Sequence, residues 1–203
     1  MVEHGDPLDD VQRRLIEETA ALGRISMMQI APEQGAFMQM LTRVSGARRA
    51  VEVGTFTGYS ALCIARGLPA DGRLLCLDTS EEWTAIARRY WREAGLDERI
   101  ELRLGPAAET LRALPEEPLF ELAFIDADKS GYPVYYEEIL KRMDSGGLIL
   151  CDNVLWFGSV ADPGNQEQST RDIRAFNDLV ASDPRVERVM LAIGDGLTIA
   201  RKR

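Results

Sequence analysis

The chain has 203 residues, of which 45% are hydrophobic and 28% are charged, which is typical of a folded globular domain and argues against disorder. Its 33 Asp and Glu outnumber its 24 Lys and Arg, and the resulting net charge of −9 would repel a nucleic acid, so no nucleic-acid partner is expected. No apolar run is long enough to span a membrane, and no secretory signal is visible, so we expect a cytoplasmic protein without a membrane partner.

The first expected elements are two amphipathic helices. Apolar residues recur at helical spacing between residues 8 and 22. A second helix is predicted to begin near Pro32 and Glu33. We expect it to bury four apolar side chains, namely Phe37, Met40, Leu41 and Val44.

From residue 50 onward, short apolar strands alternate with amphipathic helices. Strands are predicted at 50–53, 74–77, 100–104, 122–125 and 148–151. Helices are predicted at 59–66, after the N-cap Ser80, at 106–114, at 132–143 and at 169–182, and a closing hairpin is predicted at 189–200. This order predicts an α/β fold with a mainly parallel sheet and helices on both faces.

Four of the predicted strands lead into residues suited to ligand binding, namely Gly54, Asp78, Asp126 and Asp152. Ligands of such sheets bind outside the carboxyl ends of the strands. We therefore expect a glycine loop and three acids at one edge of the sheet.

Histidine and cysteine chemistry is largely excluded. The single histidine, His4, lies in a polar N-terminal segment, which argues against His-based triads and His-ligated zinc. Each of the three cysteines, Cys63, Cys76 and Cys151, lies in an apolar run and is interpreted as a reduced core residue.

The glycine loop Glu52-Val-Gly-Thr-Phe-Thr-Gly-Tyr-Ser60 has neither the phosphate-binding Gly-Lys-Ser/Thr ending nor the GxGxxG spacing. The Glu52 carboxylate would oppose a pyrophosphate and suits a cationic cofactor such as S-adenosylmethionine. Asp78 follows Gly58 by 20 residues, where an acid commonly binds ribose hydroxyls, as in either adenosylmethionine or NAD sites. The alternatives are a glycine turn without a ligand and an aspartate that caps the next helix.

Asp126, Asp152 and Asn153 offer hard oxygen ligands that suit Mg²⁺, or Ca²⁺ or Mn²⁺ in its place. Lys129, three residues after Asp126, becomes a plausible general base beside such a cation, because its ammonium form would be disfavoured there. The alternatives are loop acids that pair with lysines or cap helices, and a surface lysine.

Taken together, these motifs resemble those of the cation-dependent class I S-adenosylmethionine O-methyltransferases of the catechol and caffeoyl-coenzyme A type. The resemblance runs from about residue 25 to the C-terminus. It rests on the order and spacing of six strings, which are Glu52–Ser60, Leu77-Asp78, Gly105-Pro-Ala107, Phe124-Ile-Asp126-Ala-Asp-Lys129, Asp152-Asn-Val-Leu-Trp156 and Gly194-Asp-Gly196.

The resemblance implies one domain with a seven-stranded sheet of order 3-2-1-4-5-7-6, the last strand antiparallel. Residues 1–46 would be N-terminal helices that cover the site, and residues 47–203 would be the cofactor-binding core. It also implies a homodimer.

The resemblance further implies the roles of individual residues. Adenosylmethionine would contact Ile30, Glu52, Gly54, Thr55, Ser60, Asp78, Thr79, Ala107, Asp126 and Asp128. The metal ligands would be Asp126, Asp152 and Asn153, and Lys129 matches the proposed base.

The implied reaction is methyl transfer to one hydroxyl of a small vicinal aromatic diol. Phe157 stands where related plant enzymes contact the substrate through an Asn, which disfavours a coenzyme A thioester as the dedicated substrate. Trp156 and Phe157 could form an apolar wall for an aromatic ring, and packing in a core or dimer is the alternative. Two other functions stay open, an NAD-dependent oxidoreductase and a noncatalytic adenosylmethionine-binding protein.

Overall fold

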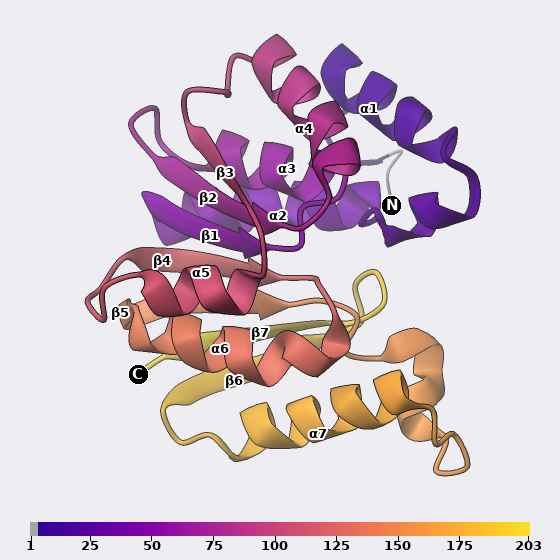
Figure 1. The fold of residues 1–203 in the computed structure, drawn as a ribbon, viewed down its shortest axis with the longest axis vertical. Helices are drawn as coiled ribbons and strands as arrows, with labels where there is room; N and C mark the ends of the chain where they lie inside the picture. Colours follow the sequence, from indigo (N-terminus) through magenta and orange to yellow (C-terminus); the bar gives the residue numbers. More distant parts are fainter. Residues whose placement is uncertain (1–3) are drawn as a thin grey trace. The chain divides into compact units, whose positions relative to one another are not determined.

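The computed structural model describes residues 4–203 and contains a seven-stranded sheet of order β3-β2-β1-β4-β5-β7-β6 with helices on both sides (Figure 1). The predicted order is therefore confirmed. The chain divides into two compact units, which are described separately. The first contains residues 1–50 and 55–105, and the second contains residues 51–54 and 106–203.

The first unit begins with α1 (Asp10–Ala20), η2 (Gly23–Met28) and α2 (Pro32–Ser45). It continues with α3 (Tyr59–Gly67), β2 (Arg73–Asp78), α4 (Glu81–Glu93) and β3 (Ile100–Leu104). Strands β2 and β3 are parallel, with Asp78 in register with Leu104. The predicted cap of α4 is confirmed, because the Ser80 side chain accepts a hydrogen bond from the Trp83 N–H at 3.2 Å.

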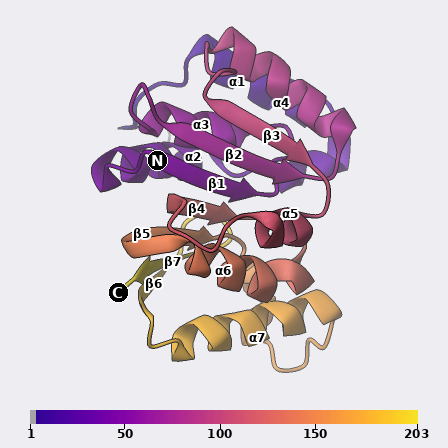
Figure 2. The same ribbon diagram turned by 60° about the vertical axis from the view of Figure 1, so that its left-hand side comes forward.

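The second unit holds most of β1 (Arg49–Val53), then α5 (Ala107–Ala113), β4 (Phe120–Ile125), η3 (Lys129–Gly131) and α6 (Tyr132–Lys141). It ends with β5 (Met143–Cys151), η4 (Trp156–Ala161), α7 (Gln168–Ser182), β6 (Val186–Leu191) and β7 (Leu197–Lys202). Helix α6 lies between α5 and α7 in both views (Figures 1 and 2). Strand β7 is antiparallel to β5 and to β6, as predicted.

The prediction for the buried face of α2 was wrong. The helix buries Gln34, Gly35, Met38 and Thr42, whereas Met40 and Val44 are 64% and 78% exposed and Phe37 and Leu41 are half-buried. A Cβ atom on Gly35 would lie 2.7 Å from the ring of Tyr59 in α3. Helices α2 and α3 pack so closely that only small or slender side chains fit between them, and the large apolar residues face outward.

The three cysteines are buried thiols, as predicted. No helix within residues 4–203 is both long and apolar enough to cross a membrane.

Candidate active site

In the first unit, Asp78 fixes the loop that follows β1. Its Oδ2 atom accepts hydrogen bonds from the backbone N–H groups of Thr55 and Phe56 at 2.8 and 2.9 Å. Its Oδ1 atom accepts one from the N–H of Ser80 at 2.8 Å. A carboxylate can accept about four hydrogen bonds, so one acceptor position is left for a ligand hydroxyl. Asp78 thus braces the loop and the start of α4.

The same loop is held in a left-handed backbone conformation by packing against α4. Phe56 has φ +50° and makes an edge-to-face contact with Trp83, with ring centroids 5.2 Å apart. The carbonyl of Gly58 accepts a hydrogen bond from Trp91 Nε1 at 3.1 Å. A non-glycine residue at positive φ persists only where its surroundings enforce it, and such residues cluster at ligand-binding sites.

In the second unit, Gly54 allows two strand ends to approach each other. It has φ +89°, and a Cβ atom there would lie 1.9 Å from the carbonyl oxygen of Asp126. The N–H of Asp126 donates to the Val53 carbonyl at 2.8 Å, and the N–H of Asp152 donates to the Ile125 carbonyl at 3.0 Å. The ends of β1, β4 and β5 are therefore adjacent, as predicted for this part of the sheet.

The ammonium group of Lys129 lies at the centre of these strand ends. Its Nζ atom donates hydrogen bonds to Asp126 Oδ1 at 3.1 Å, Asn153 Oδ1 at 2.7 Å and Tyr132 Oη at 2.6 Å. It also lies 4.6 Å from the centre of the Tyr132 ring and 5.5 Å from that of Trp156. Only 9% of the Lys129 side chain is exposed, so it is not a surface lysine.

Burial governs the ionisation of the groups around Lys129. It raises the pKa of Asp126 above its ordinary value, while the Lys129 ammonium opposes that rise and the Asp195 carboxylate adds to it. Burial, followed by the nearby Asp126 and Asp152 carboxylates, holds the pKa of Tyr132 far above its ordinary range. Tyr132 therefore remains a protonated phenol that donates to the Asp152 carbonyl at 3.1 Å.

The oxygen atoms here suit a hard cation. Asp126 Oδ1 and Asn153 Oδ1 already converge on one positively charged atom. Asp152 is buried, and its Oδ1 atom accepts a hydrogen bond from the Asn153 N–H at 2.7 Å. Within residues 4–203 no three His, Cys, Asp or Glu side chains are grouped as a metal site. The predicted set has two carboxylates and one amide, and the chemistry of these donors fits Mg²⁺ better than zinc.

The segment after Asn153 is held in an unusual backbone conformation. Asn153, Trp156 and Phe157 have φ +53°, +48° and +51°, and Gly158 follows with φ +81°. The Asp195 side chain accepts a hydrogen bond from the Phe157 N–H at 2.6 Å, and its carbonyl accepts one from the Leu155 N–H at 3.1 Å. The turn between β6 and β7 thus holds the loop that carries Trp156 and Phe157.

The remaining predicted residues differ in burial. Ile30, Glu52, Thr55, Ser60 and Ala107 are buried, Thr79 is exposed, and 72% of Phe157 is exposed. The Asp128 carboxylate accepts hydrogen bonds from Tyr135 Oη at 2.5 Å and Ser130 Oγ at 3.0 Å. Their assignments to a cofactor or substrate stay predictions.

Sequence reasoning missed two residues of this cluster. Tyr132 begins a helix three positions after Lys129, but nothing in the pattern shows that its hydroxyl turns back toward the lysine. Asp195 lies in the predicted hairpin turn, and the string Gly194-Asp-Gly196 was the available signal for it. Its role depends on which loop packs against that turn, which spacing does not reveal.

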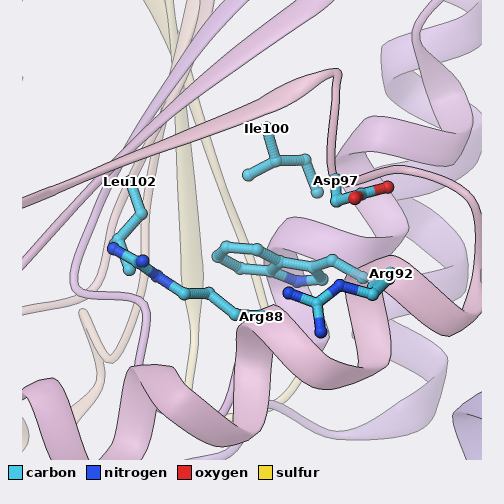
Figure 3. Close-up of a pocket in the computed structure, with 6 residues that line it drawn as sticks. Arg88, Arg92, Asp97, Ile100 and Leu102 are labelled. Atoms are coloured by element: carbon cyan, nitrogen blue, oxygen red, sulfur yellow. The ribbon is translucent and has the colours of Figure 1, made fainter.

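The first unit has a cavity of about 270 Å³ that is lined by none of the residues predicted to bind the cofactor. Its lining residues are Arg88, Trp91, Arg92, Asp97, Ile100 and Leu102. Figure 3 shows Arg88 and Arg92 on α4 beside Ile100 and Leu102 of β3. The cavity lies at Ile100, where β3 begins, whereas Asp78 is in register with Leu104, where β3 ends. The predicted cofactor residue Asp78 therefore does not line this cavity.

A family model described as O-methyltransferase matches residues 3–203. The probable caffeoyl-CoA O-methyltransferase 1 of Dictyostelium discoideum is 40% identical over 99% of this chain and 89% of its own length. The chain belongs to the O-methyltransferase family.

Two solved O-methyltransferases share the fold of this family member. The enzyme from Bacillus cereus, in complex with SAH, is 35% identical, with a TM-score of 0.90 over 99% of this chain and 94% of the other. TomG from Streptomyces achromogenes, in complex with SAM, is 28% identical, with a TM-score of 0.90 over 98% and 92% of the two chains.

The close approach of Gly54 to the Asp126 carbonyl predicts the effect of a substitution on the stability of this O-methyltransferase. Gly54→Ala forces a Cβ atom into the Asp126 carbonyl, so we expect the free energy of unfolding to fall by more than about 3 kcal/mol. Gly146→Ala is the matched control, because Gly146 has φ +93° but its nearest neighbour would be 3.6 Å away. It should cost only about 1 kcal/mol. If urea unfolding gave the same loss of free energy of unfolding for both variants, the clash at Gly54 would not be the cause.

A second prediction concerns Asp195. Asp195→Ala removes the acceptor for the Phe157 N–H, so the loop should open more often and chymotrypsin should cleave after Trp156 or Phe157 at least several-fold faster. Asp195→Asn keeps an acceptor oxygen and should be cleaved at nearly the original rate. Unchanged cleavage of the alanine variant would show that Asp195 does not hold the loop.

Proposed function

We propose that this O-methyltransferase transfers the methyl group of S-adenosylmethionine to one hydroxyl of a small vicinal aromatic diol, with the help of a divalent cation. The observation that carries the proposal is the buried contact of one amine, Lys129 Nζ, with two hard oxygen ligands, Asp126 Oδ1 and Asn153 Oδ1. A base and a cation site at one point suit the removal of a proton from a weakly acidic hydroxyl.

S-adenosylmethionine is the proposed methyl donor. The acceptor position left on Asp78 suits a ribose hydroxyl, with Thr79, Ala107 and Ile30 beside the adenosine or over the cofactor. The buried Glu52 suits the positive charges of the donor. Gly54, Thr55, Ser60, Asp126 and Asp128 would contact its methionine part. Support comes from the Bacillus cereus and Streptomyces achromogenes relatives, whose structures contain SAH and SAM.

Asp126, Asp152 and Asn153 would hold the divalent cation, with Mg²⁺ as the favoured ion and Ca²⁺ or Mn²⁺ as alternatives. A bound dication lowers the pKa of a coordinated hydroxyl, which for a free phenol is about 10. These side chains come from the ends of β4 and β5, so the backbone of the sheet sets their spacing.

The ammonium form of Lys129 would be disfavoured beside a bound dication, and once it has released one N–H proton to water the neutral amine would accept the proton of the attacking hydroxyl. Its amine is held by three oxygen atoms and faces two aromatic rings, so few positions are open to it. Tyr132 keeps its proton and therefore orients Lys129 without competing for the substrate proton. The anion formed on the substrate oxygen is then the nucleophile toward the methyl group.

Trp156 and Phe157 would form an apolar wall for the aromatic ring of the substrate. Trp156 is half-buried against Lys129, whereas Phe157 is 72% exposed and adjacent to it, with ring centroids 6.1 Å apart. An aromatic wall of this kind suits a small planar diol better than a thioester with a long polar arm.

The test is transfer of labelled methyl from S-adenosylmethionine to a panel of vicinal diphenols, with phenol and mono-methylated diphenols as acceptor controls. We expect transfer to the diols alone, loss of transfer with a chelator, and recovery with Mg²⁺. Asp152→Ala should abolish transfer while calorimetry shows cofactor binding within a few-fold of the parent protein. Undiminished transfer in the presence of chelator would overturn the metal site.

Replacement of Lys129 tests the base. Lys129→Met should lower kcat by about 10²–10⁴-fold, the usual contribution of a general base, and leave KM within a few-fold. The exposed Lys141, which pairs with Glu138, offers the control Lys141→Met with unchanged kinetics. Unchanged kcat in the Lys129 variant across the pH range would remove this lysine from the reaction.

A further inference from the structure

Helix α7 contacts the loop that carries Trp156 and Phe157 through the side chain of Arg174. The guanidinium donates hydrogen bonds to four backbone carbonyls, three of them at 2.8 to 3.0 Å, which belong to Ser159, Val160, Asp162 and Asn165. A single half-buried side chain therefore fixes the backbone over residues 159–165.

The carbonyls that Arg174 binds include the last ones of η4. This helix ends at Ala161, and the final carbonyls of a helix lack partners within it. A cation at that end satisfies them and interacts favourably with the helix dipole. A guanidinium has five N–H donors in a fixed plane, whereas a lysine ammonium has three and cannot bind four carbonyls at once. The position therefore suits arginine better than lysine.

Asn177 fixes the start of the same loop. It lies one turn after Arg174 on the same face of α7, and its Nδ2 atom donates to the Val154 carbonyl at 2.8 Å. The turn between β6 and β7 binds the loop as well, through the hydrogen bonds that Asp195 accepts. The loop is thus held at its start by Asn177, in its middle by Asp195 and beyond residue 158 by Arg174.

These contacts matter because Phe157 has little packing of its own. The residue is 72% exposed, so few side chains surround its ring and its place depends on the backbone. That backbone has positive φ at Phe157 and at Gly158, and Arg174 begins to hold it at the next residue. Trp156, in contrast, is half-buried and lies 5.5 Å from Lys129 Nζ. Arg174 therefore acts on the outer part of the aromatic wall.

We propose that Arg174 is a positioning residue that sets the place of Phe157 and thereby decides which hydroxyl of a substituted vicinal diol receives the methyl group. The inference rests on the proposed function and deepens it. Turning the aromatic ring over exchanges the hydroxyl that reacts and moves the ring substituent to the other side. A wall held at a fixed place favours one of these two orientations, whereas a wall that moves freely admits both.

Methylation of protocatechuate tests the proposal, because its two mono-methyl ethers can be separated by chromatography. Their ratio does not depend on how much of a variant is active. The parent protein should form one ether in an excess of about fivefold or more, and Arg174→Met should lower that ratio about threefold or more. The same variant should raise KM for the diol several-fold, with kcat less affected and calorimetric affinity for S-adenosylmethionine within about twofold. Arg174→Lys keeps the charge and three donors, should shift the ratio less, and carries the same test if the methionine variant does not fold.

Arg171→Met is the matched control, because Arg171 lies on the same helix but donates to Gln168 within that helix at 2.5 Å. Its product ratio should equal that of the parent. Phe157→Ala should also lower the ratio, and Arg174→Met should add no further change in that background, because both substitutions act through the same ring. Equal amounts of the two ethers from the parent, an unchanged ratio in the Arg174 variants, or additive effects of the two substitutions would overturn the proposal.

A readout without methyl transfer separates this proposal from the proposed function. Chymotrypsin should cleave the Arg174→Met variant after Trp156 or Phe157 several-fold faster than it cleaves the parent or the Arg171→Met variant, because the loop opens more often. Unchanged cleavage would show that Arg174 does not hold the loop, whether or not a diol is methylated. Transfer to the diol with an unchanged product ratio would overturn this proposal alone, whereas no transfer by the parent would overturn the proposed function on which it rests.

Discussion

The buried ammonium of Lys129 is the interaction on which the second unit of this O-methyltransferase depends. A charge taken out of water is costly unless its environment replaces the lost hydrogen bonds. Here Asp126, Asn153 and Tyr132 each accept one, and the faces of two aromatic rings add a favourable electrostatic contribution. Asp126 and Asn153 follow the ends of the neighbouring parallel strands β4 and β5, so the backbone hydrogen bonds of the sheet set their positions, whereas Tyr132 begins α6. A site built this way stays in place when the surrounding loops move.

Backbone strain accompanies that precision. Gly54 bends the chain where β1 meets the Asp126 carbonyl, and Asn153, Trp156 and Phe157 all have positive φ. For residues other than glycine, such conformations cost roughly 1 kcal/mol or more each and persist only when neighbouring contacts enforce them. Asp78 supplies those contacts in the first unit and Asp195 supplies them in the second. Each acid thus supports a loop through backbone N–H groups, and a stable loop is what a ligand needs for its binding groups to be held ready.

The strands and helices could be predicted because the apolar residues of a strand and of a helix recur with different periods along the sequence. The positions of the acids at the strand ends followed from the predicted order of these elements. The cap at Ser80 was readable for the same local reason. Contacts between elements could not be predicted from the sequence pattern. Asp78 could be assigned to a ribose or to a helix cap, but its hydrogen bonds to Thr55 and Phe56 depend on where the preceding loop folds back. Tyr132 was hidden because its position on α6 reads as ordinary helix, and its hydroxyl reaches Lys129 only through the geometry of η3.

Helix α2 shows most clearly why hydrophobic periodicity alone misled. The rule that the apolar face points inward assumes that the neighbouring element leaves room for large side chains. The packing against α3 leaves no such room. A Cβ atom on Gly35 would clash with Tyr59 and Cys63, and a Cβ atom on Gly67 of α3 would clash with Thr42. Close backbone packing therefore selects small residues for the inner face, and the helix keeps its amphipathic pattern by placing Phe37, Met40 and Val44 outside. Apolar surface that is exposed in this way gains free energy only when something else covers it. The periodic signal in this segment therefore identifies a helix correctly but does not reveal which of its faces is buried.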